Sequence, residues 1–215
     1  ASLSAQTVTT ITPDLMAPPS AYDTSKTGMV MRAHQVDLVR TPGEQNSIEN
    51  VEKQLAGGFG PSLSAATNGP LAGGWWSQTY LNNALDTNNP VNGDVNWTFF
   101  GAPALSFPGI TTDTNVVSVS TFAYEIITYL NLPAGTNVLV VGSGDSFRLT
   151  IGIGDNPFNF FAPQPANGAF SGSRAYDTNA IWLNVQSAGV YPVRIVYGQG
   201  GGTAGLQFYS LKDFC

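Results

Sequence analysis

Hydrophobic and polar residues alternate along the last third of the chain, and this pattern predicts short β-strands. In residues 131 to 153 and again in residues 180 to 211, apolar side chains recur at every second position. Such alternation is typical of strands that bury one face. The residues expected to share the buried face are Val138, Val140, Phe147, Leu149, Ile151, Ile153, Ile181, Leu183, Val185, Val193, Ile195, Tyr197, Leu206 and Phe208.

Two glycine-containing segments separate these predicted strands. Residues 142 to 145, Gly-Ser-Gly-Asp, tolerate positive φ angles, and we expect them to close a hairpin. Residues 200 to 202 are three glycines without the Lys-Ser/Thr ending and the following helix of a phosphate-binding loop. We expect them to form a wide hairpin turn or bulge.

One segment, residues 46 to 56, has the period of an amphipathic helix. Its apolar stripe consists of Ile48, Val51 and Leu55, and two glycines follow it. Asn46 and Glu49 have the spacing of a capping box. We expect this helix to cover an open end of the β-structure, with Glu49 and Glu52 on its solvated side.

Two upstream segments are expected to be strands that carry isolated titratable residues. Residues 28 to 40 contain His34, the only histidine, which excludes a polyhistidine metal site and is expected to be a hydrogen-bonded strand residue. Residues 105 to 130 are expected to give strands at 116 to 122 and at 124 to 130, with Glu125 between apolar neighbours. A glycosidase needs two facing carboxyl groups, and the local spacing places no second one beside Glu125.

The composition favours one β-domain, residues 21 to 215, preceded by an extended arm, residues 1 to 20. The chain of 215 residues has 24 Gly and 14 Pro and only 10% charged residues, which favours turns and short strands. The net charge of −6, with eight Lys and Arg, argues against a nucleic-acid partner. No apolar run is long enough to span a bilayer. The lone cysteine, Cys215, excludes an internal disulfide, and it either bridges two molecules or is an incidental thiol.

The arm contains a short segment with high β-propensity, followed by a proline-rich linker. The β-prone residues are Thr7, Val8, Thr9, Thr10 and Ile11. These residues either pair with an exposed sheet edge of a neighbouring subunit or fold back on their own domain. The start of the chain, which lacks Met, fits a secreted protein after removal of its signal peptide, or a trimmed one.

Two ordered motifs resemble the PA14 β-sandwich, LPAGTNVLVVGSGDSFRLTIG and AGVYPVRIVYGQGGGTAGLQFYS. Upstream, DTSKTGMVMRAHQVD and NSIENVEKQLAGGFGP resemble the variety found in secreted proteins of Verrucomicrobia and Planctomycetes. The resemblance implies an all-β fold, a two-sheet antiparallel sandwich related to the jelly roll, with one short helix and the extended arm. Such modules serve binding, assembly and adhesion, so fold alone does not assign a function.

In sugar-binding members of the PA14 family, two adjacent aspartates hold a calcium ion that binds glycan hydroxyls. The corresponding pair here resembles Gly144-Asp145, which lacks one carboxylate, although calcium usually takes several charged oxygens. The candidate calcium ligands are Asp145, Asp155 and Asp177. Turn formation is the alternative role for these aspartates.

A long irregular region, residues 57 to 94, is the candidate glycan-binding loop. Its candidate residues are Trp75, Trp76, Tyr80 and Asp86, because aromatic rings stack on sugars and polar groups bind their hydroxyls. The alternative places at least one of the two tryptophans in the core or in an intersubunit contact.

These observations favour a secreted, non-enzymatic structural or adhesive protein over an enzyme. The leading hypothesis is a subunit that assembles with copies of itself, through its arm, into an extracellular fibre, tube or matrix. The alternative is a lectin-like carbohydrate-binding module, assisted by calcium. Arg148 and Arg194, in the two motif strands, are expected to make structural hydrogen bonds or rim ion pairs.

Overall fold

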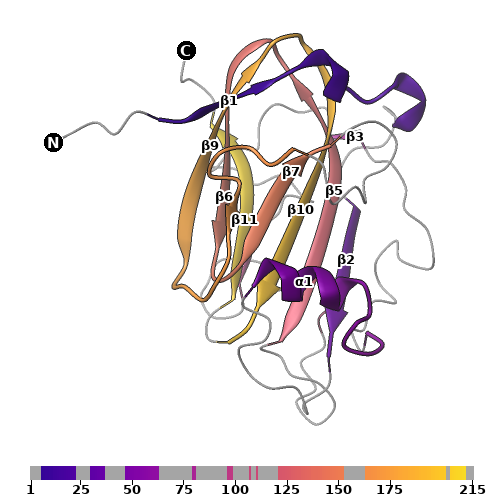
Figure 1. Ribbon diagram of the computed structural model, residues 1–215, viewed down its shortest axis with the longest axis vertical. Coiled ribbons are helices and arrows are strands. Elements are labelled where there is room, and N and C mark those ends of the chain that lie inside the picture. Colours follow the sequence, from indigo (N-terminus) through magenta and orange to yellow (C-terminus); the bar gives the residue numbers. More distant parts are fainter. Residues whose placement is uncertain are drawn as a thin grey trace, which may run out of the picture.

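Two β-sheets packed face to face form the body of the protein (Figure 1). A computed structural model describes residues 6–22, 30–36, 47–62, 79–80, 96–98, 107, 110, 121–152, 163–201 and 204–211. The first sheet has the order β1-β9-β6-β11-β4, with strands Val8–Ile11, Asp177–Val185, Gly135–Ser143, Gly205–Leu211 and Asn96–Thr98. The second has the order β2-β5-β10-β7-β8, with strands Val30–Gln35, Phe122–Leu132, Gly189–Gln199, Phe147–Ile151 and Ala169–Phe170, and β3, Thr79–Tyr80, also pairs with β5. The predicted all-β sandwich is confirmed.

The core lies between the two sheets, where alternate side chains of each strand interdigitate. Most of the residues expected on the buried face belong to it, including those of β7, β9, β10 and β11. In β6 the expected face is wrong, because Leu139 and Val141 belong to the main core cluster, whereas Val138 and Val140 do not. The apolar run of β6 is continuous, so its alternation carries no information about which face points inward. Ile153 lies outside the described residues.

The predicted hairpins are wrong, because each turn carries the chain from one sheet to the other. β6 and β7 lie in different sheets, and so do β9 and β10, and β10 and β11. We call such a connection an arch. Alternation predicts which side chains point inward, but the two sheets of a sandwich present the same alternation. The sequence pattern therefore could not assign a strand to its sheet.

β5 is a central strand that runs without interruption from Phe122 to Leu132. It pairs with β10 along its full length, from Gln199 opposite Phe122 to Gly189 opposite Leu132. The break expected between residues 122 and 124 is therefore absent. The strand expected in residues 28 to 40 is confirmed as β2.

Helix α1, Ile48–Leu55, packs against the outer face of the second sheet rather than covering an end of the sandwich (Figure 1). Its apolar stripe joins Ala123 of β5 and Val196 of β10 in a small separate cluster. The helix is capped by Ser47, whose side-chain oxygen accepts a hydrogen bond from the backbone N–H of Asn50 at 3.2 Å. The predicted cap, Asn46, lies outside the described residues.

The arm folds back on its own domain, which is one of the two alternatives that the sequence left open. β1 pairs in parallel with β9, from Val8 opposite Trp182 to Ile11 opposite Val185. The Ile11 side chain is buried in the core between the sheets. Two short 3₁₀ helices, Pro13–Leu15 and Pro19–Ala21, follow β1. Pairing of residues 7 to 11 with a neighbouring molecule, and the division at residue 20, stay predictions.

None of the helices in the described ranges is long and apolar enough to cross a membrane.

Candidate functional site

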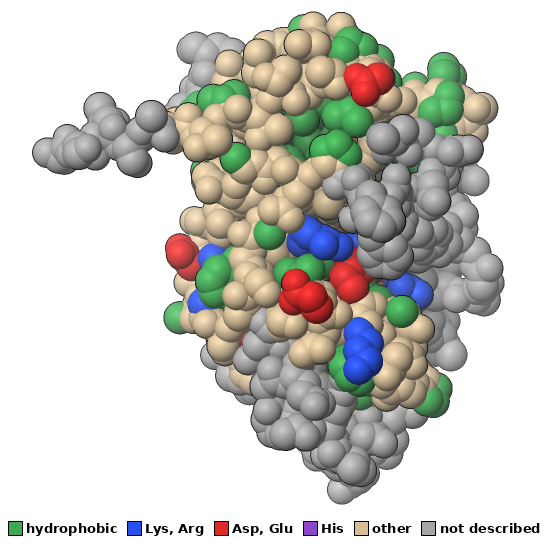
Figure 2. All heavy atoms as spheres, viewed as in Figure 1, with side chains coloured by type: hydrophobic (Ala, Val, Ile, Leu, Met, Phe, Trp, Pro, Cys, Tyr) green, Lys and Arg blue, Asp and Glu red, His purple; other side chains and the backbone are tan. Residues whose placement is uncertain are grey.

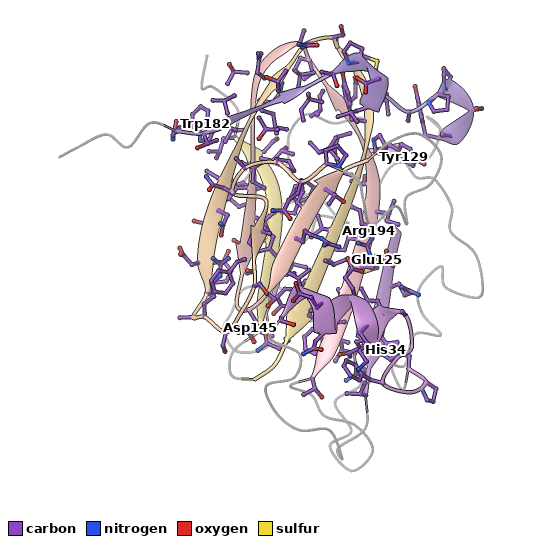
Figure 3. All side chains as sticks on the ribbon, viewed as in Figure 1. His34, Glu125, Tyr129, Asp145, Trp182 and Arg194 are labelled. Atoms are coloured by element: carbon purple, nitrogen blue, oxygen red, sulfur yellow. The ribbon has the colours of Figure 1, made fainter. Side chains whose placement is uncertain are left out.

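Asp145 lies in the arch between β6 and β7, at one end of the sandwich (Figure 3). The hydroxyl of Ser143 donates to the backbone oxygen of Asp145 at 2.7 Å. The backbone N–H of Gly144 donates to the backbone oxygen of Gly205 at 2.8 Å. These contacts fix the arch and turn the aspartate inward. Only 1% of Asp145 is exposed.

The Asp145 carboxylate joins three connections that are far apart in sequence. Oδ1 accepts hydrogen bonds from the Ser173 hydroxyl at 3.2 Å and from the Arg174 backbone N–H at 3.1 Å. Oδ2 accepts from the Gly200 backbone N–H at 2.9 Å, in the arch after β10. We call Ser143, Asp145, Ser173, Arg174 and Gly200 the Asp145 cluster. Burial raises the pKa of the Asp145 carboxyl, and these hydrogen bonds partly oppose the rise.

Replacing Asp145 with asparagine is expected to destabilise this end of the sandwich. The asparagine NH₂ group can only donate, so it faces a backbone N–H that then has no acceptor. A buried donor left without its acceptor costs about 1 to 3 kcal/mol. Urea unfolding of Asp145→Asn measures the change, with Asp177→Asn as the matched control because Asp177 is exposed. Equal stability of the two variants would contradict the structural role of Asp145.

Tyr176 presents an exposed aromatic ring beside the Asp145 cluster. Its side chain lies over two glycines of the first sheet, since a Cβ atom at Gly142 would be 2.0 Å from the Tyr176 hydroxyl and one at Gly205 would be 2.8 Å from ring atom Cδ2. The hydroxyl donates to Oε1 of Gln207 on β11. The residue remains 45% exposed, and burial of the rest raises the pKa of its hydroxyl to about 12. The ring is therefore held in a fixed orientation with part of its surface open to a ligand.

The predicted glycan site and the predicted calcium site lie apart, judged from their described residues, Tyr80, Asp145 and Asp177. Trp75, Trp76 and Asp86 lie outside the described residues, as does Asp155. Tyr80 is in β3, where its backbone pairs with Leu130 of β5. Leu130 lies near one end of β5, and Phe122 lies at the other end. Phe122 pairs with Gln199, which is next to Gly200 of the Asp145 cluster. Tyr80 and Asp145 therefore lie at opposite ends of the sandwich.

Of the predicted metal ligands, the structure brings Asp145 and Asp177 to the same end. Asp177 begins β9 and pairs with Ser143 of β6. Its carboxylate accepts from the backbone N–H of Thr178 at 2.8 Å, and its backbone oxygen accepts from Arg174 at 3.3 Å. Within the described ranges, no three His, Cys, Asp or Glu side chains gather in a way that could hold a metal ion.

Sequence reasoning did not identify Ser173, Arg174, Tyr176 or Gln207. Ser173, Arg174 and Tyr176 lie in a loop without a motif, and Gln207, which Tyr176 contacts, lies far along the chain on β11. One signal was present, because Gly142 and Gly205 interrupt strands, and a glycine inside a strand often marks close approach of another group.

A second group of charged residues lies on the outer face of the second sheet, next to α1 (Figures 2 and 3). Arg194 of β10 donates from Nε to Oε1 of Glu125 at 2.5 Å, and its two terminal nitrogens donate to the two carboxylate oxygens of Glu52, each at 2.6 Å. Arg32 pairs with Glu125 at 2.9 Å, and Arg148 also donates to Glu52. We call these five residues the arginine–glutamate network. The structural role expected for Arg148 and Arg194 is confirmed.

Glu52 was expected on the solvated side of its helix, and this expectation is wrong. Only 13% of its side chain is exposed, and it faces the sheet. Glu49, in contrast, is exposed as expected. Glu52 brings a second carboxyl group near Glu125, which local spacing could not reveal. Arg194, however, lies between the two carboxylates and donates to both, so this pair does not form the open arrangement of a glycosidase.

His34 is a buried residue of β2 on the same outer face. Its backbone oxygen accepts from Nε2 of Gln54 in α1 at 2.7 Å, which helps hold the helix on the sheet. This agrees with the expected role as a structural strand residue.

Comparison with known proteins shows which solved structures have a similar fold. No family model and no curated protein matches the chain. Among solved structures, the Epithelial Adhesin 9 A domain from Candida glabrata, in complex with Galβ1-3GlcNAc, has a TM-score of 0.53 at 12% identity, covering 97% of this chain and 90% of that one. The Epithelial Adhesin 6 A domain from the same organism, with the same glycan, has a TM-score of 0.52 at 12% identity, covering 94% and 87%. The fold is PA14-like.

A PA14 domain of the MpAFP antifreeze protein also matches, with a TM-score of 0.48 at 13% identity, covering 87% of this chain and 82% of that one. At identities this low, the likeness to the two adhesin domains shows the fold alone and leaves the ligand open.

Proposed function

We propose that this PA14-like domain is a non-enzymatic, extracellular adhesive module that binds glycans at the end of the sandwich formed by the Asp145 cluster and Tyr176. The observation that carries the proposal is the exposed ring of Tyr176, which Gly142, Gly205 and Gln207 hold in one orientation. A ring fixed in advance loses little conformational entropy when a ligand stacks on it.

Polar groups around the ring suit a neutral sugar. Asp177 and Thr178, which begin β9, are exposed next to Tyr176, and Gln207 is partly exposed on β11. Carboxylate, hydroxyl and amide groups can all hydrogen-bond sugar hydroxyls. The Asp145 cluster lies beneath them and holds the loop from which Tyr176 projects.

The solved adhesin domains of similar fold support this ligand class, since two of them were crystallised with Galβ1-3GlcNAc. Their adhesin character also supports an extracellular location. The network does not support a hydrolase, because Glu52 and Glu125, which lie near one another, are both engaged by Arg194.

A glycan array followed by calorimetry with the best ligand tests the proposal. We expect Tyr176→Ala to weaken binding about tenfold or more, since the loss of a contact worth about 1.4 kcal/mol changes affinity tenfold. Tyr176→Phe keeps the ring on Gly142 and Gly205 but loses the hydrogen bond to Gln207, so it should bind more weakly than the original chain and more tightly than Tyr176→Ala. Gly142→Ala also keeps the ring, but its Cβ displaces the tyrosine, so it should weaken binding as Tyr176→Ala does.

An array without any bound glycan would overturn the proposal. Binding that is unchanged in Tyr176→Ala but lost on changing Trp75 and Trp76 to alanine would move the site to the loop predicted from the sequence.

A further inference from the structure

The Arg174 guanidinium lies among oxygen atoms at the end of the sandwich, next to Asp145. Nη1 donates to Oδ1 of Asn179 at 2.8 Å, and Nη2 donates to the Ser143 hydroxyl at 2.7 Å and to the backbone oxygen of Asp177 at 3.3 Å. These amide, hydroxyl and carbonyl oxygens come from β6 and β9. They are of the kinds that Ca²⁺ binds in proteins.

The Asp145 carboxylate is not available to complete a calcium site. Both of its oxygens already accept hydrogen bonds from Ser173, Arg174 and Gly200. Calcium usually takes six to eight oxygens, with several carboxylates among them, and direct coordination by Asp145 would compete with these donors. With the Arg174 guanidinium among these oxygens and the Asp145 carboxylate engaged, the described residues at this position do not fit a calcium ion.

Arg174 is also held from its other side by aromatic rings. The centre of its guanidinium lies 4.3 Å from the ring centroid of Phe170 and 5.5 Å from that of Phe147. Contacts of this kind attract a cation to the ring face. Burial lowers the pKa of Arg174, while the nearby Asp177, Tyr176 and Asp145 oppose this effect.

We propose that the Arg174 side chain takes the place that a bound metal ion would occupy, so that an internal cation holds together β6, β9 and the loop carrying Tyr176. The end of the sandwich is then organised without calcium. If the proposed glycan site is correct, its affinity does not depend on calcium either; this last step alone rests on the proposed function.

Calcium titration of the full chain, pretreated with EDTA and then dialysed, tests the proposal through thermal unfolding and calorimetry. The original chain should show no saturable calcium heat, and its Tm should stay within about 1 °C between EDTA and excess calcium, because a ligand shifts Tm only if it binds the folded state. A calcium-dependent rise in Tm that Asp145→Asn abolishes would overturn the proposal.

Two substitutions at Arg174 separate charge from packing. Arg174→Met keeps an unbranched stem on the Phe170 ring but removes the cation, and we expect a lower Tm in EDTA that calcium raises by several degrees. Arg174→Lys keeps a cation and should gain no calcium response. If Arg174→Met shows no greater calcium response than the original chain, the proposal is wrong.

If Arg174→Met does not fold in EDTA, refolding with calcium gives the same decision. Recovery of the folded state supports an oxygen site vacated by the arginine, and failure to recover counts against it. Because these readouts involve no glycan, a silent glycan array alongside the expected calcium results would contradict only the proposed function.

Discussion

Arg194→Ala is expected to lower the free energy of unfolding by about 3 to 5 kcal/mol, because removing one partner of a buried ion pair leaves an uncompensated charge. The Arg194 side chain is 5% exposed and the Glu125 side chain is fully buried. Arg194 also binds both carboxylate oxygens of Glu52. Its loss therefore deprives two acids of a partner and removes one of the contacts that hold α1 on the sheet. Urea unfolding, followed by both circular dichroism and tryptophan fluorescence, measures the change.

Two matched variants test whether the geometry of Arg194 matters. Arg148→Ala removes an arginine that is more exposed than Arg194 and binds only Glu52 of the network, and it should cost about 1 kcal/mol or less. Arg194→Lys should give an intermediate loss, because one ammonium group cannot match the planar guanidinium that spans Glu52 and Glu125. If Arg194→Ala and Arg148→Ala had the same free energy of unfolding, a structural role for the arginine–glutamate network would be ruled out.

Tyr197→Ala is the second large effect, with an expected loss of about 3 to 5 kcal/mol, as for truncation of other large aromatic residues in cores. Tyr197 is fully buried on β10. Its ring stacks on Phe107, with centroids 5.7 Å apart, and tilts against Phe122 at 6.1 Å. Truncation would leave a cavity in the centre of this aromatic group, which close-packed neighbours can fill only in part.

Tyr197→Phe separates the ring from its hydroxyl. The hydroxyl donates to Oε1 of Gln199 and accepts from the backbone N–H of Gly205 at 3.3 Å. Its removal should cost about 1 to 3 kcal/mol, because both partners are left unsatisfied in the core. Thermal unfolding of the two variants side by side gives the comparison. If Tyr197→Phe were as unstable as Tyr197→Ala, the hydroxyl contacts rather than ring packing would dominate.

Local patterns predicted the strands, but not how the strands are combined. The alternation of Leu149 and Ile151, or of Ile181 and Leu183, identified residues that do lie in the core. It could not assign them to a sheet, because the inner faces of both sheets carry the same pattern. This is why the arches after β6 and after β10 were predicted as hairpins.

The error at Glu52 was avoidable from the sequence. In a helix, residues three and four apart lie on one face, and Glu52 is four residues after Ile48 and three before Leu55. An acid within an apolar stripe predicts a buried partner of opposite charge. Its identity was not predictable, since Arg148 and Arg194 come from β7 and β10, far along the chain. The neighbours of Asp145 and Tyr176 were hidden for the same reason.

The pairing of β1 with β9 has a consequence for biosynthesis. A ribosome releases β1 early, whereas β9 follows only after most of the chain has been made. β1 therefore cannot pair at the edge of the first sheet until β9 has been synthesised, and β5 cannot pair with β10 until β10 has been synthesised. Pairing of this kind is slow, and it leaves apolar strands exposed to aggregation while they wait. Production of the protein should therefore benefit from slower translation or from chaperones that shield unpaired strands.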